Sequence, residues 1–229
     1  AGLEARCRWT GAFHPRGGAL DFYREGISAI TAKDVAVAQS MNHVVKLLAI
    51  AELTPLGEIA VRVHPALIPR THPLASGRNA YNAVFVEAEA AGELMFYGRG
   101  AGGVPTASAV LGDVVAVARH LTSSALGPRE SDYADRVIAT IDQIKTQYLI
   151  RLDVTDKPGV LAAVAHAFAA ESVSIQTVRQ SERGVDAELI VVTHAASEHA
   201  LALTVKRLSQ MDTVRTVESV IRVEGVAQQ

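Results

Sequence analysis

A glycine-rich stretch, GRGAGG at residues 98–103, has the composition that most directly suggests chemistry. Its spacing satisfies the G-x-G-x-x-G pattern, in which small residues let the backbone approach a nucleotide and the amides of a following helix face its phosphates. An apolar run at residues 93–97 precedes it, and a helical pattern opened by Pro105 and Thr106 follows it. The candidate cofactor-binding residues are Gly98, Gly100, Ala101, Gly102 and Thr106.

The pattern is incomplete as a dinucleotide-binding fingerprint. A full unit continues into a second parallel strand, with an acidic residue about 20 residues beyond the glycines that binds the ribose. Here the helical pattern of residues 105–120 runs instead into LTSSALGPRESD, a connector rich in Ser, Gly and Pro. Because a lone G-x-G-x-x-G is a weak signal, a tight strand-to-helix turn with nothing bound remains the alternative interpretation.

Two histidines followed by proline, His64 and His72, invite a catalytic or metal-binding interpretation. His72 is the candidate catalytic residue, although histidines at strand ends more often make loop hydrogen bonds. A metal site is not predicted, since no third well-spaced ligand accompanies the pair. Lys46, inside the apolar run VVKLLAI, is interpreted as an edge or partly exposed lysine because lysine is rarely fully buried.

The composition limits the classes of partner. Of the 229 residues, 49% are apolar and 20% charged, and the net charge is −2. This balance is typical of a soluble globular protein and gives no electrostatic case for nucleic-acid or membrane partners. A single cysteine, Cys7, excludes an intrachain disulfide and favours a reducing, cytoplasmic setting.

Periodicity predicts the elements that hold these residues. Residues 1–22 follow neither helical nor strand periodicity and are expected to be irregular. Thr31 and Asp34 form a capping-box-like start for a helix that ends near Met41. Two strand pairs follow, HVVKLLAIAEL with GEIAVRVHPALI and NAVFVEA with GELMFYG, and then the helix of residues 105–120. Residues 23–125 are therefore expected to form an α+β unit with a mostly antiparallel sheet.

Residues 126–147 are expected to form a linker helix, and a second unit spans residues 148–225. Its β-α-β-β-α-β order is the ferredoxin-like arrangement. A turn between its first strand and first helix could receive the carboxylate of an amino acid, because a glycine there leaves helix amides open. The candidate ligand residues are Asp156, Pro158, Gly159 and Val160, and a well-made turn without a ligand is the alternative.

Several long blocks together resemble homoserine dehydrogenase of the bacterial monofunctional type, from about Tyr23 to the C-terminus. They include VKLLAIAEL, VRVHPALIPRTHPLAS and YNAVFVEAEAAGELMFYGRGAGGVPTASAVLGDVV. The segment LDVTDKPGVLAAVAHAFAAESVSI resembles an ACT domain, a regulatory amino-acid-binding module. The resemblance implies interconversion of L-aspartate 4-semialdehyde and L-homoserine with NADP or NAD, in threonine, methionine and isoleucine biosynthesis. It also implies a homodimer or tetramer and an amino-acid effector, with threonine as the natural candidate.

The resemblance also gives the glycine loop a role. In the family a Rossmann domain comes first, and the chain returns to it after a G-x-G-A-G loop that borders the nicotinamide. The primary phosphate-binding fingerprint would then precede residue 1. Aligning Gly11–Arg16 with the family's AFH segment puts its catalytic lysine near residue 4, where this chain has Glu4. The chain is therefore interpreted as a truncated or degenerate form without the nucleotide domain and the catalytic lysine.

Two alternatives to a self-sufficient dehydrogenase stay open. One is a non-catalytic amino-acid-binding protein that keeps the ACT domain and an oligomerising sheet. The other is an enzyme completed in trans by a separate chain that carries the nucleotide-binding domain. The unmatched glycine loop, followed by a helix suited to pack on something, motivates the second alternative.

Overall fold

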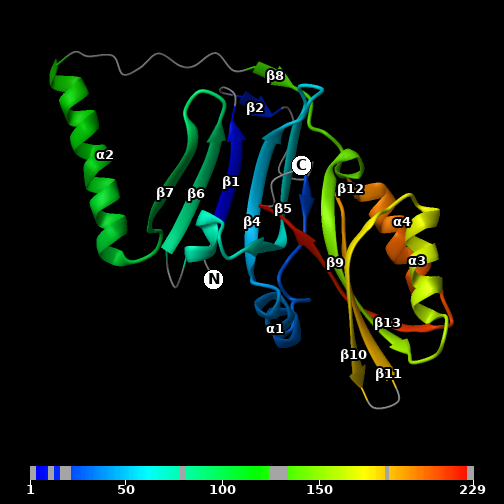
Figure 1. The fold of residues 1–229 in the computed structure, drawn as a ribbon. Helices are drawn as coiled ribbons and strands as arrows, with labels where there is room; N and C mark the ends of the chain where they lie inside the picture. The colour runs from blue at the N-terminus through cyan, green and yellow to red at the C-terminus, as the bar shows by residue number, and fades with distance from the viewer. Residues whose placement is uncertain are drawn as a thin grey trace.

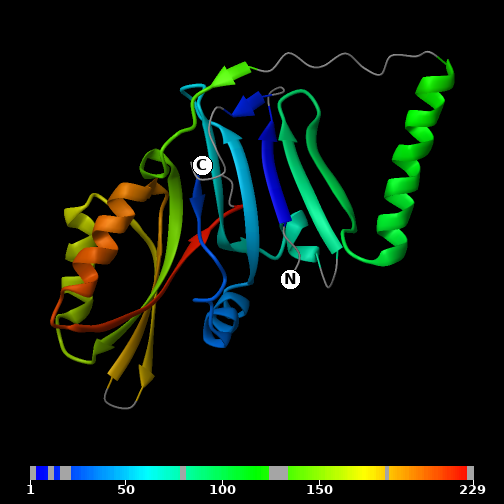
Figure 2. The same cartoon turned by 180° about the vertical axis from the view of Figure 1, so that it is seen from behind.

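The computed structural model describes residues 4–9, 13–15, 22–77, 81–123, 134–183 and 186–225. Two units share one mixed, 11-stranded sheet, whose main path runs β10-β11-β9-β13-β5-β4-β1-β6-β7 (Figures 1 and 2). The expected α+β class is confirmed. The units are joined edge to edge within the sheet, which periodicity along the chain did not indicate.

The first unit is built on two antiparallel hairpins, as the sequence predicted. β4 (His43–Leu53) pairs with β5 (Ile59–Pro69), and β6 (Tyr81–Ala88) pairs with β7 (Gly92–Arg99). A short 3₁₀ helix, η1 (Pro73–Ser76), covers one sheet face with Leu74, which packs among Leu48, Ile50 and Phe85. A two-residue strand, β3 (Tyr23–Arg24), pairs with β5 in parallel.

Helix α1 (Ala32–Ser40) begins where the sequence predicted. Thr31 is its N-cap, and the reciprocal capping box with Asp34 is present. The buried side of the helix, Val37 and Ala38, packs in one cluster with Leu67 of β5 and with residues of the second unit's sheet. Its role is therefore to join the two units.

The start of the chain differs from the expectation of an irregular segment 1–22. Residues Glu4–Trp9 form β1, which lies between β4 and β6 and is parallel to both. Phe13–Pro15 form β2, which pairs with β8 (Ala134–Arg136). Periodicity missed β1 because a strand between two neighbours receives backbone hydrogen bonds on both edges, and those partners, not local alternation, fix its conformation.

The linker helix expected at 126–147 is not found in the described part of that range. Residues 134–147 instead hold β8, a 3₁₀ turn η2 (Ile141–Gln143) and the start of the next strand. Before them, helix α2 (Gly103–Ser123) follows β7 and projects away from the sheet (Figure 1).

The second unit has the predicted β-α-β-β-α-β order. Its elements are β9 (Lys145–Thr155), α3 (Val160–Ala170), β10 (Ile175–Arg183), β11 (Asp186–Thr193), the short β12 (Ala196–Ser197), α4 (Glu198–Ser209) and β13 (Val214–Val223). α3 and α4 cover one face of its sheet around Phe168 and Leu201, and α1 of the first unit packs on the other face (Figure 1). The last residues of β13 pair in parallel with β5, which makes the sheet continuous across both units.

Candidate functional site

The glycine loop lies on the surface at the junction of β7 and α2. Gly102 has a φ of +130°, a conformation that side chains disfavour, and its carbonyl accepts the first helical hydrogen bond from the Thr106 amide at 3.1 Å. A Cβ on Gly100 would lie 1.7 Å from Nδ2 of Asn82, so the loop passes directly over β6. The structure thus places Gly98 at the end of β7, Gly100, Ala101 and Gly102 in the turn, and Thr106 in the first turn of α2, all of them exposed.

Helix α2 has no buried residue along its 21 positions. One wide stripe of the helix is nevertheless apolar. Its exposed members are Val104, Val110, Leu111, Val114, Val115, Val117 and Leu121. The opposite side carries Asp113, Ala116 and His120, which places polar and small residues away from the stripe. An exposed apolar stripe of this length makes α2 a candidate for contact with another surface.

His72 is the N-cap of η1. Its Nδ1 accepts a hydrogen bond from the Leu74 amide at 3.2 Å, so a neutral ring carries its proton on Nε2. The ring packs edge-on against Phe85 with centroids 4.9 Å apart. On its other side lies Gly225, where an added Cβ would meet the ring at 2.7 Å. The end of the second unit therefore touches this candidate residue of the first.

Lys46 is half-buried on an interior strand, and its ammonium donates to the Gly77 carbonyl at 2.5 Å. The partly exposed interpretation holds, but the edge position does not, because β4 lies between β5 and β1. The two histidines do not converge with a third ligand. Among the described residues, no group of three or more His, Cys, Asp or Glu side chains is placed to hold a metal ion.

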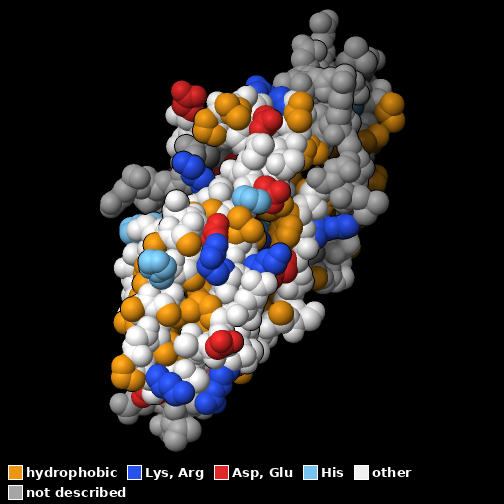
Figure 3. Space-filling view, turned by 90° about the vertical axis from the view of Figure 1, so that its right-hand side faces the viewer, with side chains coloured by type: hydrophobic (Ala, Val, Ile, Leu, Met, Phe, Trp, Pro, Cys, Tyr) orange, Lys and Arg blue, Asp and Glu red, His pale blue; other side chains and the backbone are white. Residues whose placement is uncertain are grey.

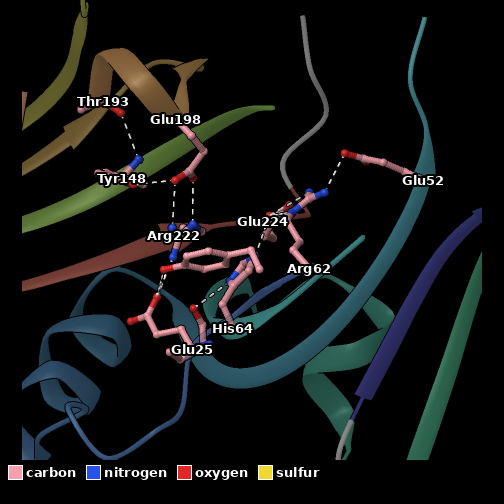
Figure 4. A network of polar contacts seen from close by, with 11 residues as sticks. Glu25, Glu52, Arg62, His64, Tyr148, Thr193, Glu198, Arg222 and Glu224 are labelled. Carbon is pink, nitrogen blue, oxygen red and sulfur yellow. Dashed lines mark hydrogen bonds and ion pairs between the residues drawn. The ribbon is translucent and has the colours of Figure 1, made fainter. Parts of the chain in front are cut away.

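A buried ionic cluster joins the two units (Figure 4). Arg222 of β13 makes a two-pronged ion pair with Glu198 of α4, with both distances at 2.8 Å, and a third contact at 2.7 Å to Glu25. The Tyr148 hydroxyl donates to Glu198 at 2.8 Å, and the Arg222 guanidinium stacks 4.5 Å from the ring centroid of Tyr23. Burial alone would lower the pKa of Arg222, but hydrogen bonding and attraction from Glu198 outweigh it and raise that pKa.

A second cluster surrounds Glu224, which lies two residues after Arg222 and directly follows β13. Its carboxylate contacts Arg62 at 3.1 Å and the ring nitrogen Nε2 of fully buried His64 at 3.6 Å. Arg62 also pairs with Glu52 of β4 at 2.8 Å. Burial would raise the pKa of Glu224, yet His64 and Arg62 lower it to about 2. The carboxylate is therefore charged and held between the two units.

A third contact fixes α1 to the second unit. Arg151 of β9 pairs with Asp34 at the helix start and with Glu188 of β11, and Lys33 reaches Glu188 at 2.7 Å. Burial would raise the pKa of Asp34, but hydrogen bonds from Ser219, Thr31 and Arg151 lower it. The capping residue of α1 thus also serves as an anchor between units.

The candidate effector turn is exposed. Gly159 is the N-cap of α3 at a φ of +91°, and no side chain caps the helix. Asp156 and Pro158 lie on the surface, whereas Val160 is buried in the core of the second unit. Gly159 adopts a backbone conformation that favours glycine, and the Val160 amide donates to the Lys157 carbonyl at 3.3 Å.

Viewed from the side of α3 and α4, acidic and basic side chains are interspersed (Figure 3). None of the described helices is both long enough and apolar enough to cross a membrane.

Sequence reasoning missed the ionic clusters. Arg62 and Glu224 are 162 residues apart, and Arg151 and Asp34 are 117 apart. The available signal was an arginine or glutamate inside otherwise apolar strands, as at Arg151 in YLIRLDV and Arg222 in VIRVE. A charged side chain inside a buried strand requires an oppositely charged or hydrogen-bonding partner, but the sequence does not indicate which residue that partner is.

Comparisons with known proteins agree with this architecture. The family model for homoserine dehydrogenase matches residues 10–115, and the model for the ACT domain matches residues 148–212. Homoserine dehydrogenase of Corynebacterium glutamicum is 52% identical over 217 residues, covering 93% of this chain and 49% of the relative. That of Mycobacterium bovis is 50% identical over 224 residues, covering 93% and 51%.

A solved structure is similar as well. The crystal structure of a homoserine dehydrogenase from Thiobacillus denitrificans has a TM-score of 0.79 and 35% identity, and the match covers 87% of this chain and 47% of that one. The chain thus spans about half the length of the relatives that it matches. The two family models match successive parts of the chain, and the relatives match along nearly all of it. This chain therefore belongs to the homoserine dehydrogenase family and carries an ACT domain in its second unit.

Proposed function

We propose that this chain provides the substrate-side and assembly unit, together with the regulatory unit, for NAD(P)-dependent interconversion of L-aspartate 4-semialdehyde and L-homoserine. The observation that carries the proposal is the match to homoserine dehydrogenases over 93% of the chain, combined with an exposed glycine loop and an uncovered helix behind it. Both features suit a surface that meets a nucleotide-binding domain.

The chain fits one wall of a nicotinamide site. Its glycine loop leaves open space above Gly98, and the helix amides that follow can face a negatively charged group. The cofactor, when bound, supplies or accepts the hydride. Gly98, Gly100, Ala101, Gly102 and Thr106 would line the site, and the rest of the nucleotide would be held by a domain outside residues 4–225. The choice between NADP and NAD belongs to that domain.

His72 is our candidate for handling a proton at the substrate oxygen. Its Nδ1 is occupied by the Leu74 amide, so Nε2 is the position from which a neutral ring could donate. In the complete enzyme, His72→Asn keeps an N-cap acceptor and removes that donor, and we expect kcat to fall about 100-fold with KM nearly unchanged. Unchanged kcat would remove His72 from the reaction.

The nucleotide-binding domain would dock on α2. The apolar stripe of this helix is exposed, and its removal from water requires a partner surface. The test is to mix the purified chain with the half of the Corynebacterium glutamicum enzyme that this chain does not match, and to measure NADPH fluorescence and homoserine oxidation. We expect binding and turnover in the mixture. Val114→Asp should abolish both, whereas Ala116→Asp on the polar side of α2 should preserve them.

The outcome separates the proposed enzyme from its alternatives. Turnover by the chain alone would show that its own residues complete the site. Turnover only in the mixture would support a dehydrogenase completed by a second domain or chain. If the folded chain neither binds NADPH nor yields turnover in the mixture, the non-catalytic amino-acid-binding protein becomes the better description.

For the effector, we propose threonine at the exposed turn of the second unit. No side chain caps α3, so the first turn of this helix keeps backbone amides that suit a carboxylate. Threonine should raise the melting temperature of the chain, and Gly159→Val should remove that effect because a β-branched residue cannot adopt the φ of +91° without strain. An unchanged threonine response in this variant would place the effector elsewhere.

We propose a homodimer as the minimal assembly. One face of the first sheet leaves apolar side chains exposed, among them Val84, Leu94 and Phe96. A second copy could cover this face by sheet-on-sheet packing. Phe96→Asp should convert a dimer to a monomer by light scattering, whereas Leu56→Asp in the β4–β5 turn should not. A dimer that survives Phe96→Asp would exclude this face.

A further inference from the structure

A cavity of about 270 Å³ lies where α1 meets the open face of the second unit's sheet. Its walls come from both units: Ala38 and Met41 of α1 and its C-cap on one side, and Leu149 and Val192 of the second sheet on the other. The cavity is distinct from the exposed effector turn. Leu149 and Thr155 are both on β9, six residues apart, which corresponds to roughly 20 Å along a strand.

The lining defines the chemistry of a ligand. Most of the wall is apolar, and no Asp, Glu, Lys or Arg side chain is among the lining residues. The polar groups are His43, Gln147, Gln176 and Thr177. Burying a charged group against the apolar wall would be costly, so we expect a net-neutral ligand whose charged groups lie at the exposed side of the cavity, beside Gln176 and Thr177.

The polar groups offer both donors and acceptors. The two glutamine amides and the threonine hydroxyl can each donate and accept. His43 holds the carbonyl of Met41 at 2.6 Å from Nδ1, so Nδ1 carries the hydrogen and a neutral ring presents Nε2 as an acceptor. A ligand with an ammonium and a carboxylate close together can therefore be paired at both groups, while its carbon chain contacts the apolar wall.

The size narrows the class further. At about 270 Å³, the cavity lies just below the usual range for drug-sized ligands. A small aliphatic amino acid has that size, a net-neutral zwitterionic end and an apolar end. We propose that this cavity is a binding site for a small aliphatic amino acid, separate from the turn at residues 156–160.

Because the cavity lies between α1 and the second unit, a bound ligand would affect the contact between the two units. The start of α1 is fixed to the second unit by Asp34 and Arg151, whereas the cavity lies beside its other end, at Ala38 and Met41. A ligand there fills the gap in the apolar packing between the units. Binding therefore tightens the junction through which β13 enters the first sheet.

The chain contains three methionines, which makes the test direct. Met41 lines the cavity, Met95 packs in the first unit, and Met211 packs on the core of the second. With methyl-¹³C methionine, L-leucine or L-isoleucine should shift the Met41 signal saturably and leave those of Met95 and Met211 in place. A response of Met211 without Met41 would contradict the proposal, and so would no response up to the solubility limit.

Matched ligands and variants complete the test. Glycine has the ammonium and carboxylate without the carbon chain, and isobutanol has the carbon chain without the two charged groups. Both should bind at least tenfold more weakly than leucine. Equal binding of isobutanol and leucine would overturn the assignment to an amino acid.

Ala38→Leu fills the cavity and should abolish the shift, whereas Ala165→Leu, exposed on α3, should not. Thr177→Val, at a surface position, should weaken binding about 2- to 10-fold, which serves if Ala38→Leu does not fold. Unchanged affinity in both cavity variants would refute the site.

Discussion

At the scale of single residues, the junction between the units depends on buried charges that are paired with opposite charges. Arg222 satisfies Glu198 through two parallel hydrogen bonds and also reaches Glu25. Glu224 is held by Arg62 and faces His64. Replacing one partner of such a pair leaves the other charge buried and uncompensated, which costs far more than the net value of the pair.

Arg222→Met should therefore destabilise the protein by about 3–5 kcal/mol, because it strands Glu198 inside the fold. Arg222→Lys should cost less but still lose stability, since an ammonium cannot make the two parallel bonds. Urea unfolding measures both. Arg207→Gln breaks an ion pair with Glu171 whose arginine is 52% exposed, and should change stability by about 0–1 kcal/mol. Similar losses for Arg222→Met and Arg207→Gln would contradict the burial argument.

Glu224 should make stability sensitive to acid. Its pKa falls from 4.5 to about 2 on folding, so its contribution is fully present above pH 4.5 and is lost as the pH drops toward 2. The shift corresponds to roughly 3 kcal/mol. Urea unfolding between pH 3 and pH 7 should show a flatter profile for Glu224→Gln than for the parent. Glu89→Gln, at an exposed position, should keep the parental slope; if it flattens the profile equally, Glu224 is not the source.

At the scale of elements, α2 stands apart from the other helices. α1, α3 and α4 each bury several side chains, and α2 buries none. Helices of this kind gain little beyond their intrinsic propensity, and α2 contains Gly112 and several β-branched valines. Among the described residues, none covers its apolar stripe.

Amide hydrogen exchange should reveal this difference. In the chain alone, amides of α2 should exchange at least about 100-fold faster than those of α3, because opening α2 exposes no core. Addition of the nucleotide-binding half of a relative should slow exchange in α2 and leave α3 unchanged. Strong protection of α2 in the isolated chain would mean that another surface, such as a second copy, already covers it.

At the scale of the whole molecule, both units share one continuous sheet. β13 belongs to the second unit by its pairing with β9 and to the first by its pairing with β5. α1 joins the same two units on the sheet face. Beyond β13, Gly225 packs against the ring of His72, so the end of the second unit is in contact with the first unit there too.

We expect the two units to unfold in a single transition. The only tryptophan, Trp9, lies in β1 of the first unit, so its fluorescence reports that unit, and far-ultraviolet circular dichroism reports both. The two midpoints should coincide in the parent chain. In Arg222→Met they should separate, since the ionic cluster between the units is lost. Separate midpoints in the parent would show that the shared sheet does not couple the units.

The sequence by itself determined the local elements. The capping box at Thr31 and Asp34, the hairpin β4–β5 and the β-α-β-β-α-β order of the second unit all follow from short-range patterns: caps, turns and alternation. The sequence also predicted the glycine turn between strand and helix, because Gly102 has a positive φ that glycine adopts without strain. These features depend on neighbours a few residues away, which periodicity records.

Only the tertiary structure decided how the pieces join. β1 takes its place because β4 and β6 flank it on both edges, and Glu224 finds Arg62 across 162 residues. The cavity beside Met41 exists because two units meet imperfectly at α1. In each case the deciding partners are far away in sequence. A buried charge or strand edge requires partners without specifying them, and only the folded chain identifies which ones it receives.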